Sequence, residues 1–151
     1  MDWRNLSADE LEFEFNPQHS VADFGSFQVE RTAASELARR EMTAQLDISY
    51  GPSPTRTLDV YPVAPCAANA APPVHVFFHG GYWRTQDKAN FAFIARTLVE
   101  LGIATVIANY DLCPEVSLDV VVDSAMQAVA WTRRNAASFG ADPERLTLSG
   151  N

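Results

Sequence analysis

Three apolar runs of strand type, each ending in turn residues, constrain the fold of this chain most strongly. They are VHVFF at 74–78, IATVIANY at 103–110 and RLTLSG at 145–150. Residues 90–101 and 118–139 lie between them and carry apolar side chains at helical spacing, so each stretch predicts a helix. The order strand, helix, strand, helix, strand predicts an α/β fold, with a mostly parallel sheet and helices on both faces. Strands that are apolar throughout fit a sheet covered on both sides.

The first 45 residues follow a different pattern and predict a helical segment. Ser7 to Glu10 fits a capping box at a helix start, and Asn16-Pro17 ends that helix. A second helix is predicted over 25–44, but the segment has too few large apolar residues for a core of its own. We therefore expect residues 1–45 to cover a domain formed by residues 46–151. In that domain, LDISYG and TLDVYP predict an antiparallel strand pair at a sheet edge.

Composition excludes several classes of partner. A chain of 151 residues with 47% hydrophobic content can bury the core of one domain. The formal net charge of -8 and the lack of a Lys/Arg cluster argue against nucleic acid. No apolar run is long enough to span a bilayer and the N-terminus has no signal-peptide pattern, so we expect a cytoplasmic protein without a membrane partner. Cys66 and Cys113 have no CxxC spacing, which favours free thiols over a metal site or a disulfide.

Residues just past the parallel strands are the first candidates for chemistry, because open α/β sheets bind ligands at the carboxyl ends of their strands. His79-Gly80-Gly81-Tyr82-Trp83 follows the first of these strands. Two glycines after a buried strand permit a sharp turn with outward N–H groups, the geometry that binds a developing oxyanion. A tight turn without a catalytic role is the alternative for Gly-Gly taken alone.

The surrounding motifs favour the catalytic interpretation. His-Gly-Gly-Tyr-Trp followed by RTQDKANFAFIA resembles the His-Gly-Gly-x-Trp motif of α/β-hydrolase fold esterases, within the arylformamidase (kynurenine formamidase) group. The resemblance continues through FNPQHSVADF, LDISYG, NYDLCPEV and AVAWTRRNAASFGADPERLTLSG, in that order along the chain. It implies an oxyanion hole from the backbone N–H groups of Gly80, Gly81 and Tyr82. It also implies that His79 supports this loop, and that Tyr82 and Trp83 are candidates for the pocket wall.

The resemblance also gives a role to the last residues, Gly150 and Asn151. The family nucleophile lies in Gly-x-Ser-x-Gly, a strained turn between a strand and a helix. Gly150 and Asn151 match the first two positions of this motif, so the serine is expected just after Asn151. Asn151 departs from the group, which commonly has His at the second position. The acid and the histidine follow the nucleophile in such hydrolases. The resemblance therefore implies that the chain is the N-terminal part of one hydrolase domain, holds no triad member and is inactive alone.

Other residues could be mistaken for catalytic groups. Ser149 precedes a glycine, but a strand-end serine with a local hydrogen bond is the favoured interpretation, and Cys113 lacks an evident base. His79 could act as a base, although a buried structural ring is favoured. Tyr110, Asp111 and Glu115 are expected to brace the loop after the second parallel strand through hydrogen bonds. Asp142-Pro143 predicts the start of a helical turn.

Two functions remain open from the sequence. The first is a serine hydrolase that cleaves a small ester or N-formyl aryl amide through an acyl-enzyme, without a metal or an organic cofactor. The second is a catalytically inactive hydrolase scaffold used for binding. The expected partner is a small-molecule substrate, and a homodimer is one oligomeric state left open. The residue after Asn151 distinguishes the two hypotheses.

Overall fold

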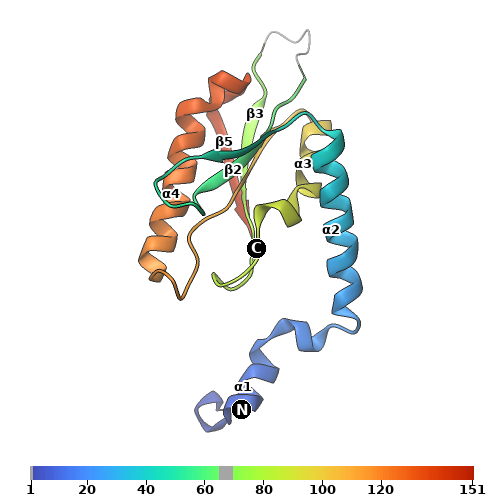
Figure 1. The fold of residues 1–151 in the computed structure, drawn as a ribbon, viewed down its shortest axis with the longest axis vertical. Coiled ribbons are helices and arrows are strands. Elements are labelled where there is room, and N and C mark those ends of the chain that lie inside the picture. The colour runs from blue at the N-terminus through green and yellow to red at the C-terminus, as the bar shows by residue number, and fades with distance from the viewer. Residues whose placement is uncertain (1, 65–69) are drawn as a thin grey trace.

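The computed structural model describes residues 2–64 and 70–151, and its centre is one five-stranded sheet (Figure 1). In the order β1-β2-β4-β3-β5, the strands span Gln45–Ser49, Thr57–Tyr61, Ala104–Ala108, Pro73–Phe78 and Asp142–Gly150. The helices are α1 (Ala8–Phe15), α2 (Phe24–Glu41), α3 (Phe93–Glu100) and α4 (Leu118–Asn135). Short 3₁₀ helices span Trp3–Asn5 (η1), Pro17–Ser20 (η2), Lys88–Phe91 (η3) and Ala136–Phe139 (η4). Cys66 lies outside the described residues.

The pairing of the strands confirms the predicted α/β sheet and its edge pair. β3 pairs in parallel with β4 and with β5, whereas β2 pairs antiparallel with both β1 and β4. β1 forms one edge, so LDISYG and TLDVYP are the predicted antiparallel edge pair. The chain passes from β3 to β4 on one side and then to β5 on the other, which creates a change of direction beside β3. Ligands of open α/β sheets bind at such a point.

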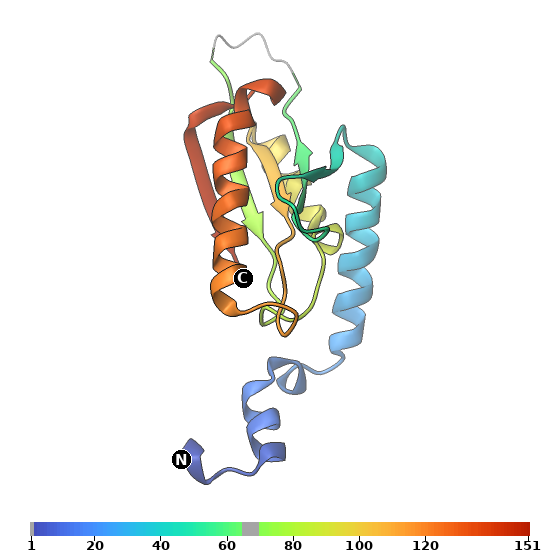
Figure 2. The same cartoon turned by 60° about the vertical axis from the view of Figure 1, so that its left-hand side comes forward.

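Helices cover both faces of the sheet, and each face has its own core (Figures 1 and 2). On the α4 side, Val74 and Val76 of β3 pack with Val106 of β4 and with Ala128 of α4. On the opposite side, Phe77 and Ile107 pack with residues of α2, η3 and α3. Alternate residues of one strand point to opposite faces, so a fully apolar strand supplies both cores.

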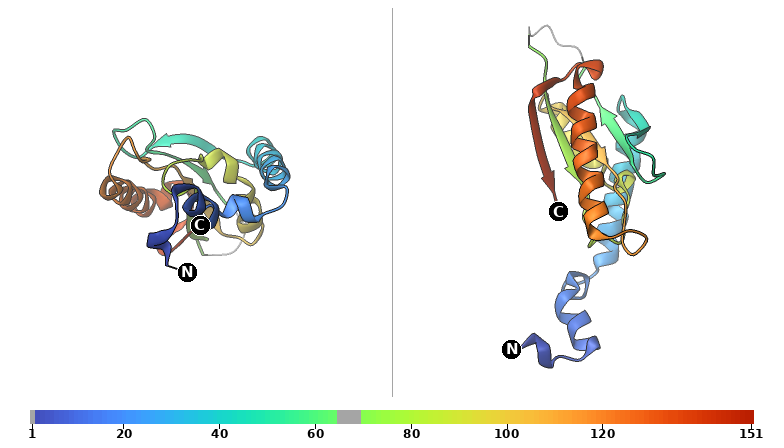
Figure 3. Two further views of the ribbon diagram at one scale, coloured as in Figure 1. Left: turned by 90° about the horizontal axis from the view of Figure 1, so that it is seen from below. Right: turned by 90° about the vertical axis from the view of Figure 1, so that its left-hand side faces the viewer.

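The N-terminal segment reaches away from the sheet, and only α2 packs against the body (Figure 3). Ser7 and Glu10 form the predicted capping box, because Ser7 Oγ accepts from the Glu10 N–H and the Glu10 carboxylate accepts from the Ser7 N–H. α1 buries none of its residues. α2 buries Ser35 and Ala38 against the body. No helix among the described residues is long and apolar enough to cross a membrane.

Some details differ from the sequence prediction. The helix predicted over 90–101 is divided into η3 and α3, and the one predicted over 118–139 into α4 and η4. Asp142-Pro143 begins β5 instead of a helical turn. Asp142 pairs with Pro73, and its carboxylate accepts from the Glu144 N–H at 2.9 Å, so the first residues of β5 form an irregular register before regular pairing resumes at Leu146. Pairing with β3 therefore determines the conformation here, and the local preference of proline for a helix start does not.

Candidate active site

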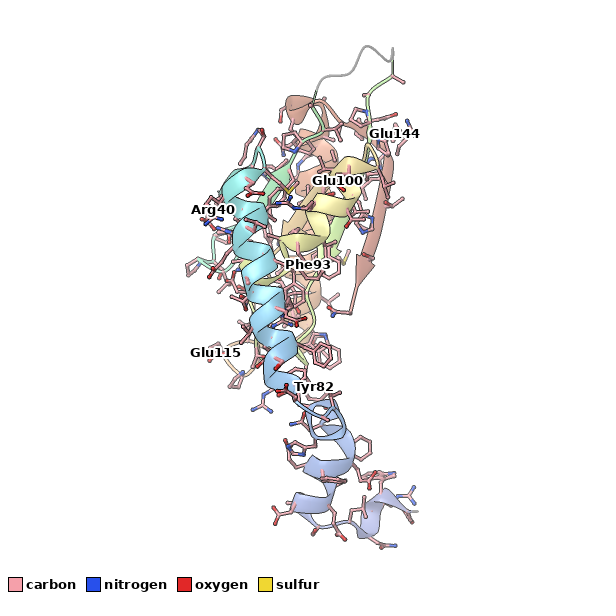
Figure 4. All side chains as sticks on the ribbon, turned by 90° about the vertical axis from the view of Figure 1, so that its right-hand side faces the viewer. Arg40, Tyr82, Phe93, Glu100, Glu115 and Glu144 are labelled. Atoms are coloured by element: carbon pink, nitrogen blue, oxygen red, sulfur yellow. The ribbon has the colours of Figure 1, made fainter. Side chains whose placement is uncertain are left out.

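The carboxyl ends of the three parallel strands meet in register. Phe78, the last residue of β3, pairs with Ala108 of β4 on one side and with Gly150 of β5 on the other. The segments that begin at His79, Asn109 and Asn151 therefore leave the sheet side by side, and the three strand ends singled out from the sequence lie together. Figure 4 shows where this edge of the sheet lies. Tyr82 and Glu115 lie at the end of the body nearest the N-terminal segment, whereas Glu100 and Glu144 lie toward the opposite end.

His79 is buried directly beneath this edge. Its ring stacks on Tyr110, with centroids 4.5 Å apart, and on Phe91, with centroids 5.7 Å apart. Only 2% of the residue is exposed, and Nδ1 lies 2.8 Å from the backbone oxygen of Gly80. Burial lowers the pKa of His79, so the ring is held in its neutral form. The burial predicted for this ring is confirmed.

The loop after His79 lies very close to neighbouring backbone oxygens and has several residues with left-handed φ angles. A Cβ on Gly80 would lie 2.8 Å from the backbone oxygen of Asn151, and a Cβ on Gly81 would lie 2.3 Å from that of Thr85. Gly81 has a φ of 118°, and Tyr82 and Trp83 follow with φ of 55° and 58°. Such values are uncommon for residues with a side chain and mark a constrained turn. No backbone carbonyl of the described residues accepts from the N–H of Gly81 or Tyr82, so both donors are free to bind a ligand.

A hollow of about 330 Å³ opens beside the loop. Trp83 and Tyr110 lie on one side of it and residues of α4 on another, with Gly150 and Asn151 at the end of β5. Tyr82 is 77% exposed and does not line the hollow; its ring leans on Trp83, with centroids 5.4 Å apart. Of the two aromatic residues considered for a pocket wall, the structure brings only Trp83 to the hollow. A larger hollow, of about 1040 Å³, is lined by Met42, Phe139 and Arg145 and includes none of the strand-end residues.

Comparison with known proteins identifies the fold family. A family model described as alpha/beta hydrolase fold matches residues 75–151, from the middle of β3 to the chain end. The chain belongs to the α/β-hydrolase fold family. The matched region contains the His79–Trp83 loop and the whole of β4, α4 and β5.

Individual relatives narrow the comparison to esterases and formamidases. Kynurenine formamidase of Danio rerio is 31% identical over 134 residues, which are 85% of this chain and 45% of that protein. Esterase LipQ of Mycobacterium tuberculosis is 32% identical over 114 residues, 74% of this chain and 27% of that protein. The chain thus spans less than half the length of these relatives.

Solved structures agree with this fold. A provisionally assigned thioesterase from Silicibacter sp. tm1040 superposes with a TM-score of 0.79 at 26% identity, over 94% of this chain and 51% of that one. Esterase B from Lactobacillus rhamnosis superposes with a TM-score of 0.67 at 22% identity, over 84% of this chain and 42% of that one. The second likeness concerns the fold alone.

The loop after β4 braces the loop after β3 and the turn before β2 through two of the three residues predicted for it. The Tyr110 hydroxyl donates to the backbone oxygen of His79. Asp111 accepts from Arg56 Nε at 2.7 Å and so joins the turn before β2 to the loop. The prediction is wrong for Glu115, whose exposed side chain forms no hydrogen bond with the described residues. Glu115 lies near the tip of the loop, where solvent is its neighbour.

Sequence reasoning missed a buried ionic cluster on the α2 side of the sheet. Lys88 Nζ donates to Asp59 Oδ1 at 2.7 Å and also to Asp47, while Arg39 donates to the other oxygen of Asp59. Lys88 is 2% exposed and Asp59 is fully buried. The sequence pattern of β2 could have indicated this cluster. Asp59 lies between the buried Leu58 and Val60, so its side chain points to the opposite face of the sheet, which is also covered.

A second missed contact changes the interpretation of Ser149. Its hydroxyl lies 2.7 Å from Nε2 of His75 on the neighbouring strand, and Nδ1 of that ring lies 2.8 Å from Thr147 Oγ1. The predicted local bond is therefore wrong, because the partner of Ser149 belongs to β3. Cys113 is a free thiol whose backbone N–H donates to the oxygen of Trp83 at 2.8 Å. Among the described residues, no cluster of His, Cys, Asp and Glu could hold a metal ion.

Proposed function

We propose that the full-length protein is a serine hydrolase, of carboxylesterase or arylformamidase type, that cleaves a small ester or an N-formyl aryl amide. The observation that carries this proposal is the close approach of Gly80 to Asn151, because the loop proposed to hold the oxyanion then lies against the residue that precedes the proposed nucleophile. The relatives named a kynurenine formamidase and an esterase support the same reaction class.

The proposed reaction needs a nucleophile just after Asn151. The serine hydroxyl of the elbow attacks the carbonyl carbon, a histidine takes the proton, and the carbonyl electron pair moves to the oxygen. Collapse of this tetrahedral intermediate expels the alcohol or amine, which receives the proton, and water then releases the acid from the acyl-enzyme. In this proposal the triad acid and histidine would follow the nucleophile in the full-length protein.

The residues of this chain would supply the oxyanion hole. The N–H groups of Gly81 and Tyr82, with Gly80 beside them, would bind the negative oxygen together with the N–H that follows the serine. One such donor contributes roughly 3–4 kcal/mol to stabilisation of the transition state. His79 would support the loop from below, and Trp83 would border the reacting group. The chemistry needs neither a metal nor an organic cofactor.

Hydrolysis assays of the full-length protein test this proposal. Short p-nitrophenyl esters and N-formylkynurenine are the substrates, and a variant with alanine in place of the residue after Asn151 is the control. We expect turnover of at least one substrate class, which the control loses by a factor on the order of 10⁶. Inactivity on both classes, or a non-nucleophilic residue after Asn151, would contradict the enzyme and support a binding scaffold.

A further inference from the structure

The loop after β4 holds the loop after β3 at three separate points. At the first, the Tyr110 hydroxyl donates to the backbone oxygen of His79. At the second, the Cys113 N–H donates to the backbone oxygen of Trp83 at 2.8 Å. The third contact is made by the side chain of Asn109 with residues 87 and 88, where the loop ends. The β4 loop therefore contacts the start, the middle and the end of residues 79–88.

Asn109 is the most fully bonded of these residues. Its side-chain oxygen accepts from the Lys88 N–H at 2.6 Å, and its side-chain nitrogen donates to Asp87 Oδ2 at 2.7 Å. Its backbone N–H donates to the oxygen of Thr57 at 2.9 Å, and its backbone oxygen accepts from the Tyr50 hydroxyl at 2.6 Å. Since one partner is a donor and the other a carboxylate, the amide fits in one orientation only.

Of the two residues that Asn109 holds, Lys88 is also fixed to the body, and Asp87 is held in its ionised form. Lys88 Nζ donates to the buried carboxylate of Asp59, so Lys88 is anchored through its side chain as well as its backbone. Burial opposes ionisation of Asp87, but hydrogen bonds from the N–H of Ala89 and the amide of Asn109 outweigh it and lower the pKa of Asp87. The ionised carboxylate is therefore the form that the Asn109 amide binds.

The backbone between these anchors needs such support. Tyr82, Trp83 and Gln86 have positive φ, which in residues with a side chain persists only when surrounding contacts hold it. Without the contacts of Asn109, the Lys88 side chain alone among these bonds would hold the end of the loop, and the backbone of residues 81–87 would have fewer fixed points. The N–H groups of Gly81 and Tyr82 would then shift relative to Asn151. A shift of about 1 Å in a reacting group can lower a rate by roughly 10²-fold.

We propose that Asn109 is a positioning residue for the oxyanion loop, because its carboxamide fastens Asp87 and Lys88 and so aims the Gly81 and Tyr82 N–H groups at the nucleophile elbow. This inference rests on the proposed hydrolase function. It assigns to Asn109 an effect on the transition state through the loop, without contact with the substrate.

The test uses Asn109→Asp in the full-length protein. Its carboxylate can still accept from the Lys88 N–H but cannot donate to Asp87, and it sets two negative charges against each other. We expect kcat to fall by about 10-fold to 100-fold while KM changes less than threefold, the pattern of an interaction made only in the transition state. Asn135→Asp is the matched control, because Asn135 also donates one side-chain hydrogen bond, to Trp131 at 2.8 Å in α4. It should leave kcat unchanged.

An exchange variant makes the test specific. Asp87→Asn combined with Asn109→Asp restores one donor and one carboxylate across the same contact, and the new amide oxygen can still accept from the Ala89 N–H. We expect this pair to recover most of kcat. Trypsin cleavage after the exposed Arg84 gives a readout that needs no activity: it should accelerate in Asn109→Asp and return toward the wild-type rate in the exchange variant.

The outcomes separate the two proposals. An inactive wild-type protein would contradict the hydrolase function, whatever the cleavage rates. An active wild type would contradict the role of Asn109 if Asn109→Asp kept kcat within threefold, if Asn135→Asp lost as much, or if the exchange restored neither kcat nor protection of Arg84. If Asn109→Asp fails to fold, the exchange variant decides alone: loss of kcat in a folded exchange variant contradicts the proposal, and wild-type kcat supports it.

Discussion

Gly80 and Asn151 come so close that a Cβ on Gly80 would lie 2.8 Å from the Asn151 backbone oxygen and 3.0 Å from its Oδ1. The two residues are 71 positions apart in the chain, and parallel pairing of β3 with β5 brings them together. The loop after β3 thus lies against the start of the proposed nucleophile elbow. This contact is the geometric basis of the proposed oxyanion hole.

Gly80→Ala is expected to lower kcat of the full-length protein by about 10²-fold, because the added methyl group must displace the oxyanion loop or the elbow. Kinetics with a p-nitrophenyl ester measure the effect. Gly25→Ala is the control, since a Cβ there meets nothing within 4 Å. It should keep kcat and raise the free energy of unfolding slightly. Equal kcat in the two variants would show that the Gly80 contact is unimportant.

Tyr110→Phe is expected to lower the free energy of unfolding by about 0.5–1.5 kcal/mol, since it removes the hydroxyl that donates to His79 and keeps the ring stack. We also expect a lower kcat, because that bond fixes the start of the oxyanion loop. Urea denaturation and ester kinetics measure the two effects. Tyr82→Phe, at an exposed ring, should change the stability by less than about 0.5 kcal/mol. If kcat of Tyr110→Phe equals that of the wild type, the bond from Tyr110 to His79 does not position the oxyanion loop.

Lys88→Met is expected to destabilise the protein by about 3–5 kcal/mol, because the fully buried Asp59 loses one of its cationic partners. The matched control is Arg133→Met, which breaks the exposed pair with Glu144 and should leave the free energy of unfolding nearly unchanged. Urea denaturation of the full-length protein gives both values. Similar losses in the two variants would contradict a structural role for the buried cluster.

Stability should decrease as the pH falls below about 6.5, the unperturbed pKa of histidine. Burial lowers the pKa of His79 and His75 in the folded protein, so the unfolded state takes up protons first as acid is added. The stability that these two neutral rings give is fully present above the pKa of histidine in the unfolded state. It is lost as the pH falls toward the lower pKa that the rings have in the folded state. Urea midpoints between pH 8 and pH 5.5 should decline less steeply in His79→Gln than in the wild type. An unchanged slope in His79→Gln would contradict this account.

The sequence was sufficient for the order of elements and for the meeting of the three strand ends. Hydrophobic periodicity located the strands, and the carboxyl ends of parallel strands share one edge. Left-handed φ at Tyr82 and Trp83 could not be foreseen, because such values are expected at glycine or asparagine and here follow from contacts with the β4 loop. The same applies to Asp142-Pro143, where pairing with β3 overrides a local preference.

The buried ionic cluster could not be predicted from the sequence for a related reason. Its four charged residues come from α2, β1, β2 and η3, and no spacing along the chain connects them. Likewise, the chain motif around Asn109 suggested a strand end, but not that its amide would fit between Asp87 and Lys88. Periodicity reports which face of an element is covered, whereas polar contacts between distant segments require the fold itself.

Covalent labelling with a fluorophosphonate tests the central claim most directly. The full-length protein is treated with the probe, digested and mapped by mass spectrometry. The account predicts a single adduct on the residue that directly follows Asn151, with Ser149 unlabelled because its hydroxyl is bound to His75 on the sheet. Loss of hydrolytic activity should follow the extent of labelling. An adduct on Ser149, or activity that persists while the residue after Asn151 is fully labelled, would contradict the proposed nucleophile elbow.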